Sequence, residues 1–547
     1  MYGDDAMSDD VNIDLRRRFD RLLSDRSVAQ ETWDEIEAFV TPYRGRFFND
    51  QRDEGSIEWH RGHVFDSTAV MSHQNLSASL HGSLSSPSIR WFEMTFRDKE
   101  MGERKPNAVW LDNANEAVYY ALQDSNFNLE VNETYQDLCG FGTAGLILEE
   151  EDGELMFSSV PLKEFVFEND WRGNVIRFYR KLEWTPAQIL SKFGDKVPDD
   201  IKKMDEDGSD EKQEVMFVIY PTSNRVAKLA ERQAPSRRKW AKRYFLKKCC
   251  TTLGTPGGYY EMPAFAPRWR TTSSSMWGNG PAHFALADIK SLNRARKIQL
   301  VGSEKKIDPP IFAEERAIIA DLDLSAASLN VVRDKEGIIA FNTGFDIFVA
   351  QADIDQLQAA VRNYYFTDQL TFPTPQAQPM TATEAQIRYE LMQKLLGPTL
   401  GRIQNDLLNP IVSRCFRILL RNGTIPPPPQ EIVESGAQFD IEYIGALSRA
   451  QKGDRAASLE RFVVAVGNMS PVMPEMVDVV DQEEVVRQLG RDLGVSPKVM
   501  RDRDEVATIK DERDEMMARQ QAAMTAQAEG DAALAQNEAQ LQQEPMI

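Results

Sequence analysis

The apolar positions of the chain form two long helical patterns in its middle, separated by a stretch without helical period. Residues 282–307 place apolar side chains on one face, at Leu286, Ile289, Leu292 and Leu300. At about 1.5 Å per residue this helix would be roughly 39 Å long. Residues 351–370 repeat the pattern, with Ile354, Leu357, Val361 and Tyr364 facing inward. Residues 308–350 have the short apolar runs and turn residues of strands, so the pattern predicts a small β-rich segment bracketed by two helices.

The residues before this pair of helices predict an α+β body. The first 40 residues indicate two helical stretches, with Leu15, Phe19, Leu22 and Leu23 on one face of the first and Pro42 closing the second. From residue 57 to 270, helical patterns alternate with short strands. The strand candidates are residues 153–162, 174–184, 214–221 and 242–250.

Prolines interrupt the helical pattern at several places after the second amphipathic helix. In "TFPTPQAQPM", residues 371–380, three prolines forbid a helix. The helical pattern restarts at Thr381 and runs to about residue 420, interrupted at Gly397-Pro398 and at Asn409-Pro410. An extended "IPPPPQ" spacer, a strand at 437–445 and several helices over 446–518 follow. The Ala/Gln-rich stretch after them predicts disorder or an isolated helix.

The stretch "CGFGTAGLILEE", residues 139–150, contains Gly140-x-Gly142-x-x-Gly145, the spelling of a dinucleotide-binding loop. Such a loop needs a strand before the glycines and a helix after them, because the pyrophosphate sits at the helix N-terminus. Here the order is reversed: residues 106–138 have helical spacing, and a hairpin with Asp152-Gly153 in its turn follows the glycines. We therefore expect a structural loop in which glycine caps a helix, with no bound nucleotide.

The other candidates for chemistry do not form a catalytic constellation. Four of the five histidines lie between His60 and His81, but residues 64–80 predict a helix on which His73 and His81 are two turns apart. No cysteine lies nearby to complete a zinc site, and the four cysteines have the spacing of free thiols in a reducing compartment. No serine stands in a nucleophile elbow, and no P-loop occurs. We expect no enzyme activity, no cofactor and no metal.

The chain is strongly acidic, with a formal net charge of −21. Because proteins that grip nucleic acid usually carry a basic face, the average surface should repel DNA. A basic run between Arg232 and Lys248, interleaved with Trp240, Tyr244 and Phe245, favours a strand with a solvated outer face over nucleic-acid contact. No run of 18 apolar residues predicts a transmembrane helix, and "MYGDDAMSDD" is not a secretory signal.

The order of these pieces resembles the portal proteins of tailed bacteriophages, in particular the head-to-tail connector family of short-tailed, podovirus-type phages. The matching pieces cover about residues 15–510. They are "VFDSTAVMSHQNLSASLHGSLSSPSIRWFEM", "FGTAGLILEE", "PAFAPRWR" followed by "WGNGPAHFALADIKSLN", "DPP", and "TATEAQIRYELM" after the proline-rich stretch. Their order and spacing together carry the resemblance.

The resemblance implies a portal-protein fold with an α/β wing, a two-helix stem, a β-containing clip and a C-terminal helical crown. Carried onto this chain, the wing would be 1–270 and 383–446, the stem helices 271–307 and 351–371, the clip 308–350 and the crown 447–520. Residues 372–382 would form the channel loop, with DNA-facing residues Phe372, Pro373, Thr374, Pro375, Gln376 and Gln378. The low-complexity tail, 521–547, has no family motif, and we expect it to be disordered or an isolated helix.

The resemblance further implies a homo-oligomer, usually of twelve subunits, at one capsid vertex of the virion and assembled in the host cytoplasm. Double-stranded DNA would pass through its channel during packaging and ejection without sequence specificity. The terminase packaging motor, tail adaptor proteins, and capsid and scaffolding proteins would be its partners, and no membrane is implied.

The charge of the chain suits a conduit. Twelve copies at −21 each would total about −250, and a lining that does not hold phosphates lets DNA slide. Lys290, Arg294 and Lys297 recur at i, i+4 and i+7, and we predict that they form basic rings that steer DNA; the alternative is salt bridges with a neighbouring subunit. Two rival classes stay open: an acidic scaffold or adaptor without a channel, and a nucleotide-binding enzyme using the Gly140–Gly142–Gly145 loop.

Overall fold

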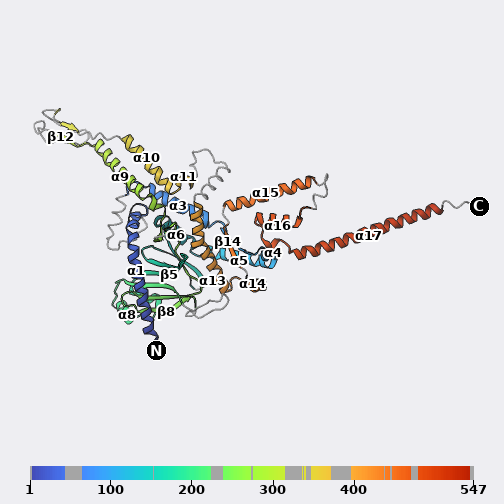
Figure 1. Cartoon of the computed structure of the whole chain (residues 1–547), viewed down its shortest axis with the longest axis horizontal. Helices are drawn as coiled ribbons and strands as arrows, with labels where there is room; N and C mark the ends of the chain where they lie inside the picture. Colours follow the sequence, from blue (N-terminus) through green and yellow to red (C-terminus); the bar gives the residue numbers. More distant parts are fainter. Residues whose placement is uncertain are drawn as a thin grey trace, which may run out of the picture. The chain divides into compact units, whose positions relative to one another are not determined.

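The protein divides into two compact units. A computed structural model describes residues 3–42, 64–151, 153–222, 238–272, 275–313, 336, 338–340, 347–370, 396–436, 438–443, 446–469 and 479–541. Unit 1 comprises Met1–Trp91 and Ala117–Thr424, and unit 2 comprises Phe92–Glu116 and Ile425–Ile547. Both combine helices with antiparallel strands, so the fold class is α+β, as predicted (Figure 1). None of the helices in the described part is long and apolar enough to span a membrane.

The largest sheet of unit 1 has five antiparallel strands in the order β4-β5-β6-β7-β8. Their bounds are β4 Phe165–Asn169, β5 Val175–Trp184, β6 Gln213–Pro221, β7 Trp240–Leu246 and β8 Thr252–Tyr259. β5, β6 and β7 fall on predicted strands, whereas β4 and β8 were not among them. β4 is a five-residue strand that is apolar at consecutive buried positions, so it lacks the alternation that identifies a half-exposed strand.

Three smaller sheets complete the strands of unit 1. β2 Gly145–Glu151 pairs with β3 Glu154–Val160 and with β9 Ala264–Phe265. The β2–β3 hairpin is the one that the sequence predicts, and Gly153 has a φ of +90° in its turn. β10 Thr271–Thr272 pairs with β11 Ser275–Gly278, and β12 Ile311–Ala313 pairs with β13 Ile338–Ala340.

The N-terminal region is one helix, α1 Gly3–Phe39, and the prediction of two helical stretches is wrong. Leu15, Phe19 and Leu22 are buried, as the pattern predicts. The polar stretch after Leu23 contains Arg26, which is also buried and whose guanidinium donates to backbone carbonyls of unit 1. A hydrogen-bonded arginine thus continues the buried face through the polar stretch.

An aromatic cluster joins α1 to the five-stranded sheet. The rings of Phe165 and Phe178 stack with centroids 5.1 Å apart. Trp277 meets Phe167 edge-on at 5.1 Å and Trp33 at 5.0 Å. Each such ring contributes about 1.5–3 kcal/mol by burial, so this cluster is a main part of the core of unit 1.

The other helices of unit 1 belong to three groups. Before the large sheet come α3 Thr68–Leu84 and α6 Phe127–Phe141, and inside its connections come α7 Pro186–Phe193 and α8 Asp199–Glu206. The middle of the chain gives α9 Pro281–Ile307, α10 Ile347–Tyr364 and α11 Thr367–Leu370. Residues 396–403 are helical and continue through a π-helical turn, Gln404–Leu408, into α13 Asn409–Asn422. The π turn lies at the predicted Asn409-Pro410 interruption, since Pro410 has no N–H to donate.

Unit 2 combines one antiparallel strand pair with several helices. β1 Phe92–Phe96 pairs antiparallel with β14 Phe439–Tyr443, which joins segments about 350 residues apart. Its helices are α4 Lys99–Glu103, the N-terminal part of α5 Lys105–Asp124, α14 Gln430–Ser435, α15 Ala446–Met469, α16 Gln482–Leu493, a short 3-10 turn Pro497–Val499, and α17 Arg503–Leu541. The single helical pattern predicted over 106–138 is two helices, α5 and α6, which break at Ser125-Asn126.

The C-terminal stretch is helical as far as Leu541. The described side chains of α17 from Lys510 to Gln527 are all exposed. The helix extends through residues 521–541, and whether the tail is disordered or an isolated helix stays a prediction. Residues 542–547 lie outside the described residues.

Candidate functional site: the paired helices α9 and α10

The start of α9 is positioned by a contact between glycine backbones. Gly142 caps α6 with a φ of +73°, and its N–H donates to the Leu138 carbonyl (3.0 Å). A side chain at Gly142 would come closer than 3.0 Å to backbone atoms of Gly278, Asn279 and Gly280, which lead into α9. The Gly278 N–H donates to the buried Thr143 hydroxyl (2.8 Å). The glycines thus end a helix and start a strand, as predicted, and Gly142 also packs on the backbone that leads into α9.

A histidine completes the first turn of α9. The Gly280 N–H donates to Nδ1 of His283 (3.2 Å), which satisfies a backbone donor at the helix start. This bond requires an unprotonated Nδ1, and burial lowers the pKa of His283 to about 4. At neutral pH the imidazole is therefore uncharged and serves as a helix cap.

α9 and α10 lie side by side (Figure 1). The inward face of α9 carries the buried side chains Ala282, Ala285, Ile289 and Leu292. Leu286 is half-buried and Leu300 is 48% exposed, so Leu300 does not belong to this face as predicted. The Gln299 amide donates to the Gln351 side chain of α10 (2.8 Å), so beyond Leu292 a polar bond joins the helices.

The inward face of α10 contains the predicted residues except the last, where Tyr365 is buried instead of Tyr364. Ile354 and Val361 are fully buried and Leu357 is half-buried. Tyr364, however, is 41% exposed, and Tyr365 is buried in its place, edge-on to His73 of α3 at 6.4 Å. Both tyrosines lie within one turn of Val361, and packing against α3 decides which of them is buried.

The predicted basic stripe lies on the exposed side of α9. Lys290 forms an ion pair with Glu35 of α1, with Nζ 2.6 Å from Oε1. The Lys297 ammonium lies over the Phe65 ring, 5.3 Å from its centroid. Arg294 is exposed between them, and no described residue pairs with it. One of the three cations thus has an ion-pair partner in its own chain, one has an aromatic contact, and one faces solvent.

The far end of the helix pair exposes apolar side chains. They belong to the last three turns of α9, to β12 and β13, and to the start of α10 (Ile298, Leu300, Val301, Ile307, Ile311, Phe312, Ile339, Phe348 and Val349, each 39% to 87% exposed). We call these nine residues the apolar tip. Soluble monomers rarely expose so much apolar surface on adjoining elements, so the tip has the character of a protein interface.

Several predicted residues fall outside the described residues. The six channel-loop residues belong to the segment 371–395, for which no structure is described (Phe372, Pro373, Thr374, Pro375, Gln376 and Gln378). The same holds for His60, His63 and the part of the basic run from Arg232 to residue 237.

The histidines and cysteines of the described part make separate contacts. His73 Nε2 donates to the Gln136 carbonyl (2.8 Å), and His81 Nδ1 lies 3.2 Å from the Ser85 hydroxyl. No group of three or more His, Cys, Asp or Glu side chains that could hold a metal ion occurs within the described ranges. Cys139 and Cys415 are buried, and burial raises the pKa of both thiols, so neither is poised as a nucleophile.

The basic run is a structural strand where it is described. Trp240, Tyr244 and Phe245 of β7 are buried. The ammonium of Lys242 pairs with Glu149 (2.5 Å), and Lys247 pairs with Glu214 (3.0 Å). The strand agrees with the interpretation favoured from the sequence, but Lys242 and Lys247 are half-buried in ion pairs rather than solvated.

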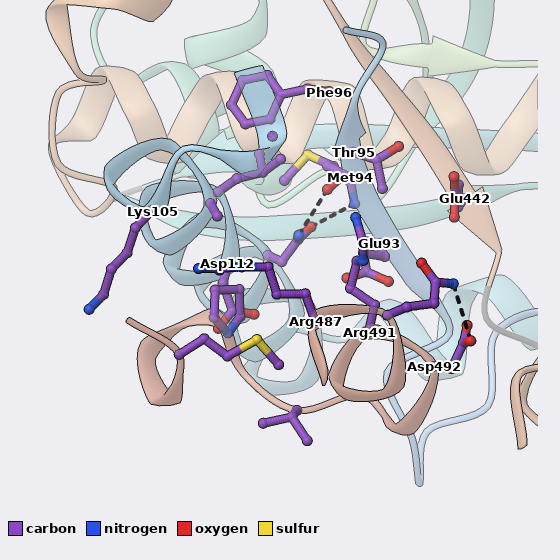
Figure 2. A pocket seen from close by; sticks show the side chains of 18 of the residues that line it. Glu93, Met94, Thr95, Phe96, Lys105, Asp112, Glu442, Arg487, Arg491 and Asp492 are labelled. Atoms are coloured by element: carbon purple, nitrogen blue, oxygen red, sulfur yellow. Dashed lines mark hydrogen bonds between the residues drawn. The ribbon is translucent and has the colours of Figure 1, made fainter. Parts of the chain in front are cut away.

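Unit 2 contains a cavity of about 500 Å³ lined by β1, β14, α5 and α16 (Figure 2). The side chain of Asn115, which lines the cavity, accepts a hydrogen bond from the Met94 N–H (2.8 Å) and donates one to the Met94 carbonyl (3.1 Å). Arg487, which projects into the cavity, is already paired with Glu483 (2.8 Å). The described residues that line it include no Ser, Cys or His, so they offer no pair of nucleophile and base.

Comparison with known proteins identifies the family. The sequence profile of the family described as "Bacteriophage head to tail connecting protein" matches residues 13–500. The "Probable portal protein" of Bordetella phage BPP-1 is 28% identical over 519 residues, which cover 93% of this chain and 92% of the relative. The "Portal protein" of Salmonella phage epsilon15 is 27% identical over 533 residues, or 95% and 93% of the two chains. The chain belongs to the family of bacteriophage head to tail connecting proteins, which are structural proteins and not enzymes.

Proposed function

We propose that this protein is a portal subunit that assembles into a ring, of twelve copies, at one vertex of the capsid. The ring would be the channel through which double-stranded DNA is packaged and ejected. The observation that carries the proposal is the family match over residues 13–500 together with the helix pair α9/α10 that brackets the apolar tip. A subunit whose tip exposes nine large hydrophobic side chains gains stability by packing them on identical neighbours.

The parts of the portal are assigned to the chain as the sequence suggests. Residues 1–270 and 383–446 form the wing, 271–307 and 351–371 the stem, 308–350 the clip and 447–520 the crown. The clip docks the terminase during packaging and the tail adaptors afterwards, and the subunit also meets capsid and scaffolding proteins in the host cytoplasm. The pairing of α9 with α10 and of β12 with β13 supports the stem and clip assignments.

Electron microscopy of the purified full-length protein tests the ring. We expect closed, holed rings of one fixed symmetry. A double substitution, Phe312→Asp with Ile339→Asp, should disperse the rings, because each aspartate would put a charge into an apolar contact. Val28→Asp is the matched control, since Val28 is 84% exposed on α1, away from the tip. Monomers of the unmodified protein at high concentration would refute the proposal.

The channel residues are tested separately from assembly. We propose that Arg294, with Lys290 and Lys297, forms basic rings that steer DNA along the axis. Arg294→Glu should leave ring assembly intact and reduce DNA packaging, and the triple charge reversal should reduce it further. Lys290→Glu also breaks the exposed pair with Glu35, a loss of at most about 1 kcal/mol. Unchanged packaging by the triple variant would remove the steering role.

The proline-rich segment is the proposed channel loop. Its prolines restrict the backbone, and Thr374, Gln376 and Gln378 offer uncharged polar tips toward the DNA. Deleting residues 374–378 should permit rings but impair packaging or retention of DNA. A normal phage yield from the deletion would contradict this role.

A further inference from the structure

The turn between β4 and β5 presents an exposed tryptophan. Trp171 is 86% exposed, and the guanidinium of Arg172 lies over its ring, 4.5 Å from the centroid. Tryptophan side chains are usually largely buried in a folded chain, and tryptophan and arginine are enriched among the residues that dominate the binding energy of protein interfaces. This pair of side chains therefore has the character of an interface anchor.

Hydrogen bonds fix the conformation of this turn. One carboxylate oxygen of Asp170 accepts from the backbone N–H groups of Arg172 and Asn174, both at 2.8 Å. Gly173 has a φ of +86°, and its carbonyl accepts a bond from Arg268 (2.8 Å). Because the turn is ordered before any partner arrives, a partner that packs on it loses little binding energy to ordering it.

The same turn borders a cavity of about 260 Å³ in unit 1. Gly173 and Asn174 form one wall, and the other walls come from residues in and next to β9 and from the helical segment 405–417. This volume is below the roughly 300–1,000 Å³ of most small-molecule sites. A side chain of a partner protein therefore fits the cavity better than a cofactor does.

The charged groups of this cavity leave one arginine without a counter-charge. Glu261 forms its shortest ion pair with Arg421 (2.6 Å), which lies outside the lining. Asp406 Oδ2 lies 3.8 Å from Nη2 of Arg268. Arg417 is half-buried in the lining, and its guanidinium has no ion-pair or hydrogen-bond partner in the part of the chain that the structure describes. It is therefore the cation of this cavity with which a carboxylate from outside the chain would pair.

Arg268 adds an unsatisfied donor to the same cavity. Its Nη2 donates to the Gly173 carbonyl, but its Nε is buried and makes no hydrogen bond within the described ranges. Burial lowers the pKa of the Arg268 guanidinium, because the charged form loses solvation. A hydrogen-bond acceptor that entered the cavity would compensate this loss, so two of its arginines favour an electronegative group.

We infer that Trp171, Arg172 and Arg417, which we call the turn surface, contact a second copy of this chain that presents an apolar side chain to the tryptophan and a carboxylate to Arg417. The inference rests on the proposed ring, which places copies of the chain side by side. Because each copy carries a formal charge of −21, copies repel each other unless cations of one meet carboxylates of the next. A closed ring joins two different surfaces of the subunit, so an unpaired arginine on one surface can meet a carboxylate on the other.

Oxidative footprinting of purified full-length rings tests whether the turn surface is covered. Hydroxyl radicals oxidise exposed tryptophans, and mass spectrometry reads the extent of oxidation at each position. In rings, Trp171 should be protected to the level of the fully buried Trp33, and in subunits dissociated by dilution it should be oxidised rapidly. Equal, rapid oxidation of Trp171 in rings and in free subunits overturns the inference while leaving the ring itself established.

A cross-link identifies the partner of Arg417. Arg417→Lys keeps the positive charge and supplies an amine, which a carbodiimide couples to a carboxylate within contact distance. When isotope-labelled and unlabelled subunits are assembled together, the amide link from position 417 should join a labelled chain to an unlabelled one at an Asp or Glu. Links that stay within one chain, or that form only to a different virion protein, contradict a contact between copies.

Charge reversal measures what the contact contributes to the ring. Arg417→Glu should raise the concentration at which rings dissociate by about tenfold or more, because it places a carboxylate against a carboxylate, whereas Arg417→Lys should keep most of the affinity. Lys203→Glu makes the same charge change at an exposed position of α8 outside the turn surface and should have no such effect. Circular dichroism shows that each variant folds. Failure of the unmodified protein to form rings defeats the proposed function itself, whereas rings that are as stable with Arg417→Glu as with Lys203→Glu defeat only this inference.

Discussion

Replacing Gly142 by alanine tests whether the glycine contact positions the helix pair. Gly142 has a φ of +73°, a conformation that costs an L-residue about 1–2 kcal/mol. The new methyl group would also lie closer than 3.0 Å to Gly280 N, Gly278 O and Asn279 C. All three are backbone atoms, so no side chain can rotate away. Relief requires a shift of the chain that leads into α9, and such overpacking costs about 1–3 kcal/mol.

Two other glycines supply controls because each isolates one part of this cost. Gly423 caps α13 with a φ of +80°, but a methyl group there meets no described atom within 4 Å. Gly423→Ala should therefore cost only the backbone term of about 1–2 kcal/mol. Gly140 is inside α6 and its nearest neighbour would be His73 Nε2 at an ordinary 3.4 Å. Gly140→Ala should be neutral or stabilising by up to about 1 kcal/mol, because alanine favours a helix.

Gly142→Ala should thus destabilise unit 1 by about 2–5 kcal/mol, the sum of the two terms. Urea unfolding gives the change in free energy for the three variants. Hydrogen exchange read by mass spectrometry then reports where protection is lost, which we expect at residues 139–146 and 277–286. If Gly142→Ala costs no more than Gly423→Ala, the close backbone approach plays no part in holding α9. Loss of protection elsewhere would equally contradict the reasoning.

Three further changes follow from the charges and burial of the described residues. The pKa of His283 is about 4 in the folded protein and 6.5 in the unfolded chain, so between these values only the unfolded chain binds the proton. The free energy of unfolding should therefore fall by up to about 3 kcal/mol as the pH drops from 6.5 to 4. Urea titrations of His283→Gln should lack that part of the pH dependence. Glu261 pairs with Arg414, whose side chain is 4% exposed. Glu261→Ala leaves this buried guanidinium without its counter-charge, so it should lower the free energy of unfolding by about 3–5 kcal/mol in the same assay. Deleting residues 521–547 should change the unfolding free energy by less than about 0.5 kcal/mol, and a larger loss would mean that this helix packs on the body.

Helices α9 and α10 could be predicted because their periodic patterns are long and are bounded by prolines, glycines or polar turns. The errors occur where the helical spacing does not decide which side chain is buried. Tyr364 and Tyr365 both lie within a turn of Val361, and the contact with His73 selects the second. Leu300 continues the apolar stripe in sequence, but it lies beyond the region where α9 is covered, so it is exposed. Periodicity specifies a face of a helix, and tertiary packing specifies how far that face is buried.

The partners of the charged residues could not be predicted, because they come from distant positions in the sequence. Lys290 and Glu35 are 255 residues apart and meet through the packing of α9 on α1. Six cationic side chains that line one recess of unit 1 are spread from Arg26 to Lys247, and no local motif joins them. The short strand pair β1–β14 is equally non-local. Spacing rules apply within one element, so they miss sites that several elements build together.

Net charge alone is a poor guide to whether this protein would attract DNA, because ion pairs within the chain neutralise some of its charges. Within the most basic run of the sequence, Lys242 pairs with Glu149 and Lys247 pairs with Glu214, so part of its positive charge is neutralised. The three-residue stripe on α9 has fewer cations, yet Arg294 faces solvent. A repeated ring of one exposed arginine per subunit, within an otherwise acidic assembly, would attract phosphates weakly and at one height of a channel. Weak contact is what a conduit requires, since each phosphate held tightly would have to be released before the DNA could advance.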